Sequence, residues 1–226
     1  MQHPSLEHLD SWVFDLDNTL YPATSSLFPQ IDQRMRAFIA ELLGLSDAEA
    51  HALQKRYYRE FGTTLRGLML VHGLEPQRFL DYVHDIDRSV LTPSLELGKA
   101  LAGLPGRKLI FTNGTETHAV KVLERLGLSC HFEGIFDIHA SDYVPKPDPL
   151  TYKRLLARFD LKAERAAMFE DIARNLKPAF ELGMTTVWVK AEEPEFYHDT
   201  EDAHVHYATD DLAGWLAYAS ATGKAT

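Results

Sequence analysis

The chain has 226 residues, of which 45% are hydrophobic, so it can bury a full core as one α/β domain and still carry a modest insertion. Its 33 acidic and 23 basic residues give a formal net charge of −10, which argues against binding to nucleic-acid polymers or to anionic membranes. Cys130 is the only cysteine, which excludes disulfide frameworks and cysteine-based metal sites.

No apolar stretch approaches the ~20 residues that a membrane-spanning helix needs, and the polar start Met1-Gln2-His3-Pro4 is not typical of a signal peptide. We therefore expect a cytoplasmic protein without a membrane partner. The first ten residues and the last eight are expected to fray. The sequence leaves the oligomeric state open.

The first predicted strand ends in two acidic residues, within the stretch Trp12-Val13-Phe14-Asp15-Leu16-Asp17-Asn18-Thr19-Leu20. A run of three apolar residues before the acids is typical of a buried strand. If the backbone stays extended, Asp15 and Asp17 point to the same side. Their repulsion is tolerable with a cation between them, for which Mg²⁺ is suited, or with one carboxyl protonated. A solvated turn is the alternative.

Apolar residues at helical spacing predict four helices after this strand, over residues 27–43, 46–61, 65–71 and 76–88. Gly44 ends the first helix, and Ser46 with Glu49 forms a capping box that begins the second. Nothing in this part of the chain has the pattern of a strand. We predict an all-helical cap domain over residues 22–92, inserted into an α/β core domain of residues 1–21 and 93–226.

Strands and helices alternate after residue 93. The expected strands cover residues 107–112, 135–138, 166–169, 185–189 and 204–207, and the expected helices cover residues 93–103, 115–127, 148–159, 173–182 and a C-terminal segment through Leu212 and Leu216. The charged stretch 191–203 is expected to be a surface loop. This order predicts a doubly wound, Rossmann-like α/β fold with a mostly parallel sheet.

Polar residues gather where the predicted strands end. In chain order they are Asp15 and Asp17, Thr112 and Asn113, Lys146, and Glu170 and Asp171. Each has an ordinary explanation when taken alone, since threonine caps helices, most lysines are exposed and acids favour helix N-termini. Their ordered occurrence at the carboxyl ends of strands, where open α/β sheets bind ligands, favours one common site.

These residue types suit the hydrolysis of a phosphate ester. Asp15 would act as a carboxylate nucleophile and form an aspartyl phosphate. Asp17 would protonate the leaving oxygen and later take a proton from water; if it is protonated at rest, it also relieves the repulsion with Asp15. Lys146 would offset negative charge, and Thr112 with the N–H groups at Asn113 and Gly114 would bind phosphate oxygens.

The stretches FDLDNT, FTNG, KPDP and FED resemble the four motifs of the haloacid dehalogenase-like hydrolase superfamily. The place of the insertion resembles the helical-cap branch, and FDLDNTLYP resembles the pyrimidine 5′-nucleotidases. The resemblance implies Mg²⁺ held by the side chain of Asp15, the backbone carbonyl of Asp17 and the side chain of Asp171, with Glu170 as a further or outer-shell ligand. Many relatives have another acid where this chain has Asn175, whose role is left open.

The resulting prediction is a Mg²⁺-dependent phosphomonoester hydrolase acting on a small-molecule phosphate ester, with a pyrimidine nucleoside 5′-monophosphate as the first choice of substrate. A sugar-phosphate phosphatase, a phosphoglucomutase-like phosphoryl transferase and a non-catalytic phosphate-binding module are the alternatives. Dehalogenase chemistry is disfavoured because Asp17 is present. The aromatic residues Tyr57, Tyr58 and Phe61 could stack on a base, but packing in the core is the expected role for most of them. The histidines at positions 72, 84, 118 and 139 are expected to be solvated or at the core edge.

Overall fold

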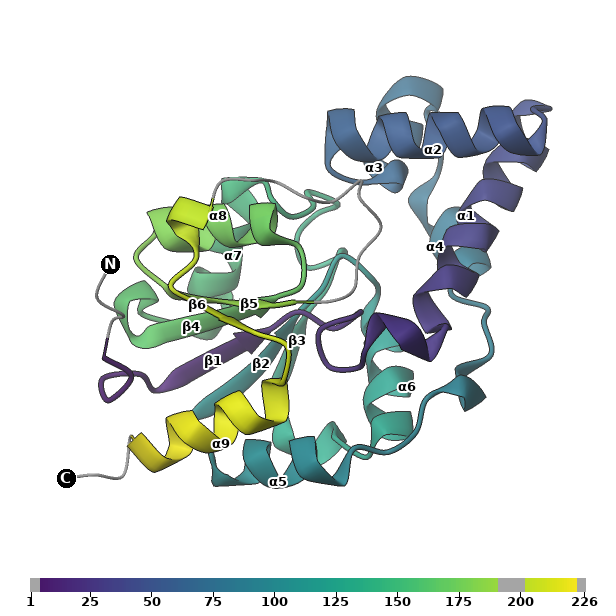
Figure 1. The fold of residues 1–226 in the computed structure, drawn as a ribbon. Coiled ribbons are helices and arrows are strands. Elements are labelled where there is room, and N and C mark those ends of the chain that lie inside the picture. The colour runs from purple at the N-terminus through teal and green to yellow at the C-terminus, as the bar shows by residue number, and fades with distance from the viewer. Residues whose placement is uncertain (1–4, 191–201, 223–226) are drawn as a thin grey trace.

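The computed structural model of the protein describes residues 5–190 and 202–222. Within these ranges the chain forms a sheet of six strands in the order β3-β2-β1-β4-β5-β6, and every neighbouring pair is parallel (Figure 1). The strands are β1 Ser11–Phe14, β2 Arg107–Phe111, β3 Gly134–Phe136, β4 Ala166–Glu170, β5 Thr185–Val189 and β6 Tyr207–Thr209. This is the strand order of a doubly wound sheet, so the predicted fold class is confirmed.

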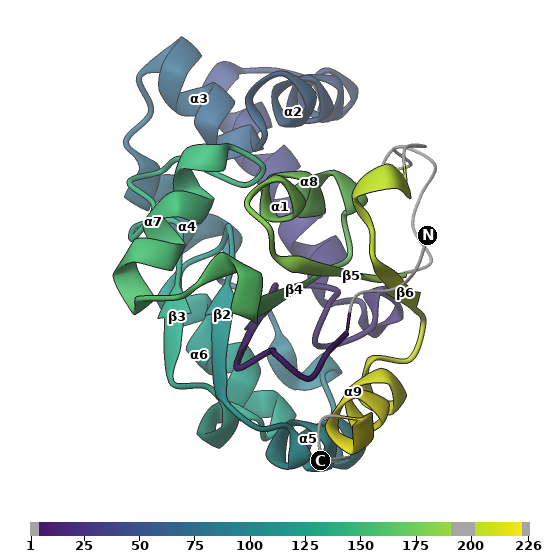
Figure 2. The ribbon, with the colours of Figure 1, turned by 90° about the vertical axis from the view of Figure 1, so that its left-hand side faces the viewer.

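Helices cover both faces of the sheet. One face carries α5 Leu95–Gly103, α6 Glu116–Leu126 and α9 Leu212–Thr222, and the other carries α7 Pro149–Phe159 and α8 Ala173–Glu181 (Figures 1 and 2). A parallel sheet needs this cover, because strands joined by helical crossovers are buried on both sides. None of the described helices is both long and apolar enough to cross a membrane.

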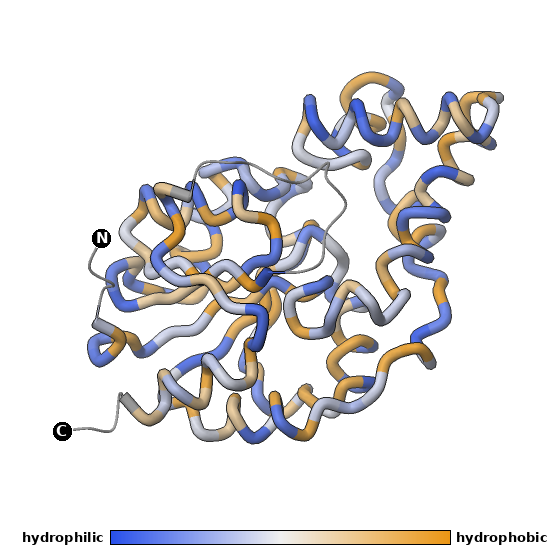
Figure 3. The backbone as a smooth tube through the Cα atoms, viewed as in Figure 1, coloured by the Kyte–Doolittle hydropathy of each residue, from blue (hydrophilic) through white to orange (hydrophobic). Residues whose placement is uncertain are grey.

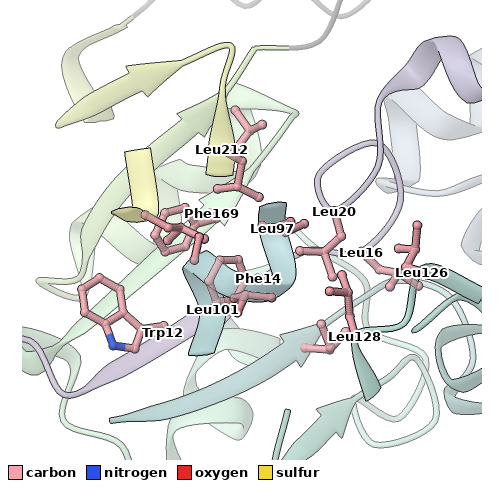
Figure 4. Close-up of a cluster of buried hydrophobic side chains, with 14 of the residues drawn as sticks. Trp12, Phe14, Leu16, Leu20, Leu97, Leu101, Leu126, Leu128, Phe169 and Leu212 are labelled. Carbon is pink, nitrogen blue, oxygen red and sulfur yellow. The ribbon is translucent and has the colours of Figure 1, made fainter. Parts of the chain in front are cut away.

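The strand β1 sends side chains into both layers of the core. Trp12 and Phe14 join the apolar cluster toward α5, α6 and α9, whereas Val13 joins the cluster toward α7 and α8. The rings of Phe14 and Phe169 are stacked with their centroids 4.4 Å apart. Both side chains lie in the cluster toward α5, α6 and α9, part of which the close-up draws (Figure 4). Successive side chains point to opposite faces because a strand has a two-residue period, so β1 is buried on both sides.

Helices α1 Leu27–Leu43, α2 Asp47–Phe61, α3 Thr64–His72 and α4 Pro76–Val83 form a separate body beside the sheet (Figure 1). They share their own apolar cluster, and apolar and polar residues alternate along each of them (Figure 3). The predicted capping box is present, since the backbone N–H of Ser46 donates to Glu49 and Glu49 N–H donates to Ser46. The domain limits at residues 22 and 92 stay a prediction.

Some element boundaries differ from the sequence-based expectation. Helix α4 ends at Val83 and not at residue 88, because Asp87 instead caps a short 3-10 turn at Arg88–Val90 by accepting from Ser89 N–H. Strand β6 begins three residues later and ends two residues later than expected. Leu6 and Leu9 are buried in the sheet core, and α9 continues to Thr222, so the expected fraying of both ends is wrong in these parts. Most of the predicted loop 191–203 lies outside the described residues.

The turn before β2 requires glycine. Gly106 has a φ of +87°, and an added Cβ would lie 2.2 Å from the Asp10 carbonyl oxygen. That oxygen also accepts the Arg107 N–H at 2.8 Å, which ties it to the start of β2. We expect Gly106→Ala to lower the free energy of unfolding by about 3 kcal/mol, because backbone strain and a clash add together.

Gly183→Ala is the matched control for this substitution. Gly183 has a φ of +92° but no atom within 4 Å of an added Cβ. The control therefore carries the backbone strain alone and is expected to lose about 1 kcal/mol. Urea unfolding of both variants measures the difference, and equal losses would contradict the clash at Asp10.

Candidate active site

The carboxyl ends of three adjacent strands meet at one cavity. Strands β1, β2 and β4 lie side by side, and the residues that follow or end them line a cavity of about 730 Å³ that continues toward α1, α2 and α4. All seven residues predicted for the site line it: Asp15, Asp17, Thr112, Asn113, Lys146, Glu170 and Asp171. The strand order places them at the crevice beside β1 and β4, where the sheet changes winding direction.

The ammonium group of Lys146 lies at the centre of this arrangement. Its Nζ donates to Asp15 Oδ1 at 2.6 Å, to Glu170 Oε1 at 2.7 Å and to the Phe111 carbonyl at 2.9 Å. The residue is 2% exposed, and these three acceptors use all three of its donors. Asn113 holds the same residue by its backbone, since Asn113 Oδ1 accepts Lys146 N–H at 2.9 Å. Lys146 is therefore fixed beside Asp15 from both ends.

Burial and the attraction between Lys146 and its carboxylate partners shift the pKa values of Asp15 and Lys146 in opposite directions. Burial raises the pKa of Asp15 to about 7, with the Lys146 ammonium opposing and the Glu170 carboxylate adding to the rise. For Lys146, burial by itself lowers the pKa, but the Asp15 and Glu170 carboxylates outweigh it and the pKa lies above its ordinary value. Lys146 therefore stays positively charged. A proton competes for the Asp15 carboxylate near neutral pH unless a cation in addition to Lys146 binds beside it.

Asp17 is held by two donors on one oxygen. Its Oδ1 accepts the Tyr21 hydroxyl at 2.5 Å and lies 2.9 Å from His118 Nε2. Burial raises its pKa, yet the charge and hydrogen bond of His118 and the hydrogen bond of Tyr21 outweigh burial and leave the pKa lowered. The expectation that Asp17 could be protonated at rest is therefore wrong for the free site, because both donors stabilise the carboxylate.

Some polar groups of the loop after β2 form hydrogen bonds within the loop and with the start of α6. The Thr112 hydroxyl accepts the Gly114 N–H at 2.9 Å, so this N–H is engaged within the turn. Thr115 caps α6 by accepting from His118 N–H at 3.1 Å. The hydroxyl proton of Thr112 and the Asn113 N–H stay as the predicted phosphate donors. The Asn113 side chain serves a different purpose, because it pairs with the backbone of Lys146.

Three carboxylates have the spacing of a metal site. One oxygen each from Asp15, Glu170 and Asp171 lies within 4.8 Å of the others, and all three residues are buried. Thr19 lies between two of them, with its hydroxyl 3.3 Å from Asp15 Oδ2 and 3.4 Å from Asp171 Oδ1. Lys146 pairs with two of these acids, Asp15 and Glu170. A hard divalent cation with oxygen ligands suits a set of three buried carboxylates.

Glu170 is held by three protein donors. Its Oε1 accepts from Lys146 and from Asn175 Nδ2, each at 2.7 Å, and its Oε2 accepts the Ile172 N–H at 2.8 Å. Both oxygens are already used by protein donors, which favours the outer-shell alternative for Glu170. The same contacts give Asn175 a role that the sequence left open, because its amide fixes the carboxylate that holds Lys146.

Proton competition at Asp15 predicts a pH-dependent affinity for Mg²⁺. Asp15 has a pKa raised to about 7, so below this pH a proton occupies the ligand, and above it the carboxylate is free. We expect Mg²⁺ to bind about tenfold more tightly at pH 8 than at pH 6. Thermal unfolding against Mg²⁺ concentration measures the affinity at each pH. Asp171→Asn is the control that should remove the stabilisation, and equal wild-type affinities at both pH values would contradict the prediction.

The structure adds residues that the sequence did not assign to the site. His118 is 1% exposed and contacts Asp17, so the expectation of a solvated or core-edge histidine is wrong for it. Its position in the first turn of α6, next to the FTNG stretch, is the signal that could have found it. Tyr21, within the stretch FDLDNTLYP, also contacts Asp17 through its hydroxyl. Tyr57 is buried in the cluster of α1–α4, whereas Tyr58 lines the cavity.

Comparisons with known proteins are consistent with this arrangement. The model of a family described as haloacid dehalogenase-like hydrolase matches residues 10–183. Phosphate metabolism protein 8 of Saccharomyces cerevisiae is 30% identical over 189 residues, which cover 76% of this chain and 58% of that protein. The matched part is thus less than two thirds of the length of this relative.

Solved structures with the same fold include a dehalogenase and a magnesium-bound protein. The L-2-haloacid dehalogenase of Xanthobacter autotrophicus with covalently bound chloropropionic acid has a TM-score of 0.57 at 15% identity and covers 92% of this chain and 97% of its own. The protein YfnB of Bacillus subtilis, bound to magnesium, has a TM-score of 0.59 at 16% identity and covers 93% of this chain and 98% of its own. At these identities the likeness concerns the fold alone.

Proposed function

The chain belongs to the haloacid dehalogenase-like hydrolase family, and from this premise we propose that it is a phosphomonoester hydrolase with Asp15 as its nucleophile. The observation that carries the proposal is the pairing of Asp15 Oδ1 with Lys146 Nζ at 2.6 Å, in a cavity that Asp17 also lines. A permanent cation beside a nucleophilic carboxylate suits attack on an anionic phosphate, because it reduces the repulsion between the two.

In the first step, a carboxylate oxygen of Asp15 attacks phosphorus, and the bond from phosphorus to the ester oxygen breaks. The leaving oxygen takes a proton from Asp17. This carboxyl is ionised in the free site, and a phosphate bound next to it favours its protonated form because like charges raise the pKa of a carboxyl. The products of this step are an alcohol and an aspartyl phosphate at Asp15.

In the second step, Asp17 takes a proton from water, which attacks the aspartyl phosphate and releases inorganic phosphate. Thr112 and the Asn113 N–H bind the phosphoryl oxygens, and Lys146 stays paired with Asp15. A divalent cation held by Asp15, Asp171 and the Asp17 carbonyl would neutralise charge between nucleophile and phosphate. The magnesium bound to YfnB of Bacillus subtilis, which has the same fold, supports Mg²⁺ as this ion.

A pyrimidine nucleoside 5′-monophosphate is the proposed substrate. The cavity of about 730 Å³ falls within the range for small-molecule sites and continues from the acids into the α1–α4 body. Tyr58 and Phe28 line it with the polar residues Lys55 and His51, which gives surfaces for a planar base and its polar edge. The pyrimidine preference itself rests on the resemblance of FDLDNTLYP.

Release of inorganic phosphate from a panel of esters tests the proposal. We expect Mg²⁺-dependent turnover of UMP and CMP at a higher kcat/KM than of sugar phosphates. A clear preference for sugar phosphates would overturn the nucleotide assignment alone, and net transfer of the phosphoryl group to a second sugar phosphate would favour a mutase. No release of phosphate from any ester would overturn the phosphatase.

A further inference from the structure

The carboxylate of Asp17 is bonded asymmetrically. Both of its hydrogen-bond donors, the Tyr21 hydroxyl at 2.5 Å and His118 Nε2 at 2.9 Å, reach the same oxygen, Oδ1. No hydrogen bond reaches Oδ2 from the residues that the structure describes. The side chain is 15% exposed, and the residue lines the cavity. One oxygen is therefore held by the protein, and the other is left for a group in the cavity.

The two donors are themselves fixed. Tyr21 is 3% exposed and packs in the apolar cluster of the sheet with Leu20 and Leu27. His118 lies in the first turn of α6, where its N–H is tied to Thr115, and its ring stacks on His84 with the centroids 4.4 Å apart. A buried tyrosine and a buried, stacked histidine leave the carboxylate little freedom to rotate.

The donors also come from different parts of the fold. Tyr21 lies on the connection from β1 to α1, His118 lies on a helix of the sheet domain, and His84 follows α4 on the return connection. His84 contacts α6 a second time, since its Nδ1 lies 3.3 Å from the Thr115 hydroxyl. Both connections between the sheet and the α1–α4 body therefore contact the group of residues that holds Asp17.

We propose that Tyr21 and His118 are positioning residues that hold Asp17 by Oδ1, so that Oδ2 is the oxygen that exchanges protons with the leaving group and with water. This inference rests on the proposed phosphatase function. It adds to that function the atom that exchanges protons, Asp17 Oδ2, and the two side chains that orient the carboxylate. Tyr21 and His118 touch Asp17 and act on the substrate only through it.

Proton donation to the leaving oxygen is worth most when that oxygen is a poor leaving group. An alkoxide from a nucleotide or glycerol phosphate needs the proton, whereas p-nitrophenolate leaves almost without it. A substitution that frees the Asp17 carboxylate to rotate should therefore lower kcat/KM for alkyl esters much more than for p-nitrophenyl phosphate. A general loss of folding or of phosphate binding would lower both to the same extent.

The experiment compares kcat/KM for UMP, glycerol phosphate and p-nitrophenyl phosphate in the full chain with Mg²⁺. We expect His118→Phe to lower the value by about 10²-fold for the alkyl esters and by less than about tenfold for p-nitrophenyl phosphate. Tyr21→Phe should show the same pattern with a smaller loss, because His118 still holds Oδ1. Asp17→Asn gives the largest split and sets the upper limit.

Two further variants separate positioning from structure. His118→Gln keeps an N–H donor near the position of Nε2 and should recover part of the alkyl-ester activity. Tyr82→Phe removes a hydroxyl from a tyrosine on α4 that packs against Phe38, and it should leave the ratio between substrates unchanged. Equal losses for all three esters, or no loss in both His118→Phe and Tyr21→Phe, would overturn the inference. A wild-type protein that hydrolyses none of the esters would instead overturn the phosphatase on which the inference depends.

Discussion

The substitution Asp15→Asn should abolish turnover, lowering kcat by roughly 10⁴-fold or more, because an amide oxygen cannot form the aspartyl phosphate. The variant should still fold. The asparagine side chain has nearly the same shape, and its oxygen can still accept from Lys146 Nζ, which lies 2.6 Å from Oδ1 in the wild-type protein. The backbone N–H of residue 15, which donates to the Phe169 carbonyl at 2.9 Å, is unchanged. Loss of activity without loss of fold is therefore the expected result.

Two measurements make this prediction specific to the nucleophile. Release of phosphate from UMP gives kcat, and mass spectrometry of acid-quenched wild-type protein should show one added phosphoryl group that the Asp15→Asn variant lacks. The matched control is Asp10→Asn, which changes a carboxylate paired with Arg165 at the other end of β1 and should leave turnover unchanged. Turnover of Asp15→Asn near the wild-type rate would contradict the proposed mechanism at its first step.

The substitution Lys146→Met should cause the largest loss of stability. It removes the cation that is bonded to Asp15 and Glu170 at 2.6 and 2.7 Å, and it leaves two carboxylates buried side by side. Breaking a buried ion pair from one side costs about 3–5 kcal/mol, because the remaining charge stays buried without its counter-charge. We expect a loss of this size in the free energy of unfolding without divalent ions.

Urea unfolding with and without Mg²⁺ measures this effect. Mg²⁺ should restore part of the lost stability, because it supplies positive charge to the same acids. The control is Arg165→Met, in which the arginine pairs with Asp10 at 2.6 Å and the two side chains are 46% and 49% exposed. That pair should be worth less than about 1 kcal/mol. Equal losses in the two variants would mean that the buried triad contributes no more than an exposed pair.

The two predictions test different properties of one arrangement. Asp15 is held by Lys146, and Lys146 is held by Glu170, whose carboxylate is held in turn by Asn175. A nucleophile fixed in this way does not need to be reoriented when substrate binds. The raised pKa of Asp15 and its expected response to Mg²⁺ follow from the same burial that excludes water.

The sequence by itself determined the fold class, the helical segment after β1 and the edge of the sheet at which the polar residues gather. These are properties of short stretches. The two-residue and 3.6-residue periods of apolar positions specify strands and helices, and the order of elements specifies a parallel sheet whose carboxyl ends meet. Placing Asp15, Lys146 and Asp171 at one cavity required only the order of strands along the chain.

Only the tertiary structure decided which group holds each acid. Asp17 meets His118 across 101 residues, and Lys146 meets Asp15 across 131. Such pairs depend on distances of a few tenths of an ångström, which the packing of α6 and of the loop after β3 sets and no local pattern encodes. For the same reason the sequence allowed a protonated Asp17, whereas the two donors that the fold brings to Oδ1 keep it a carboxylate.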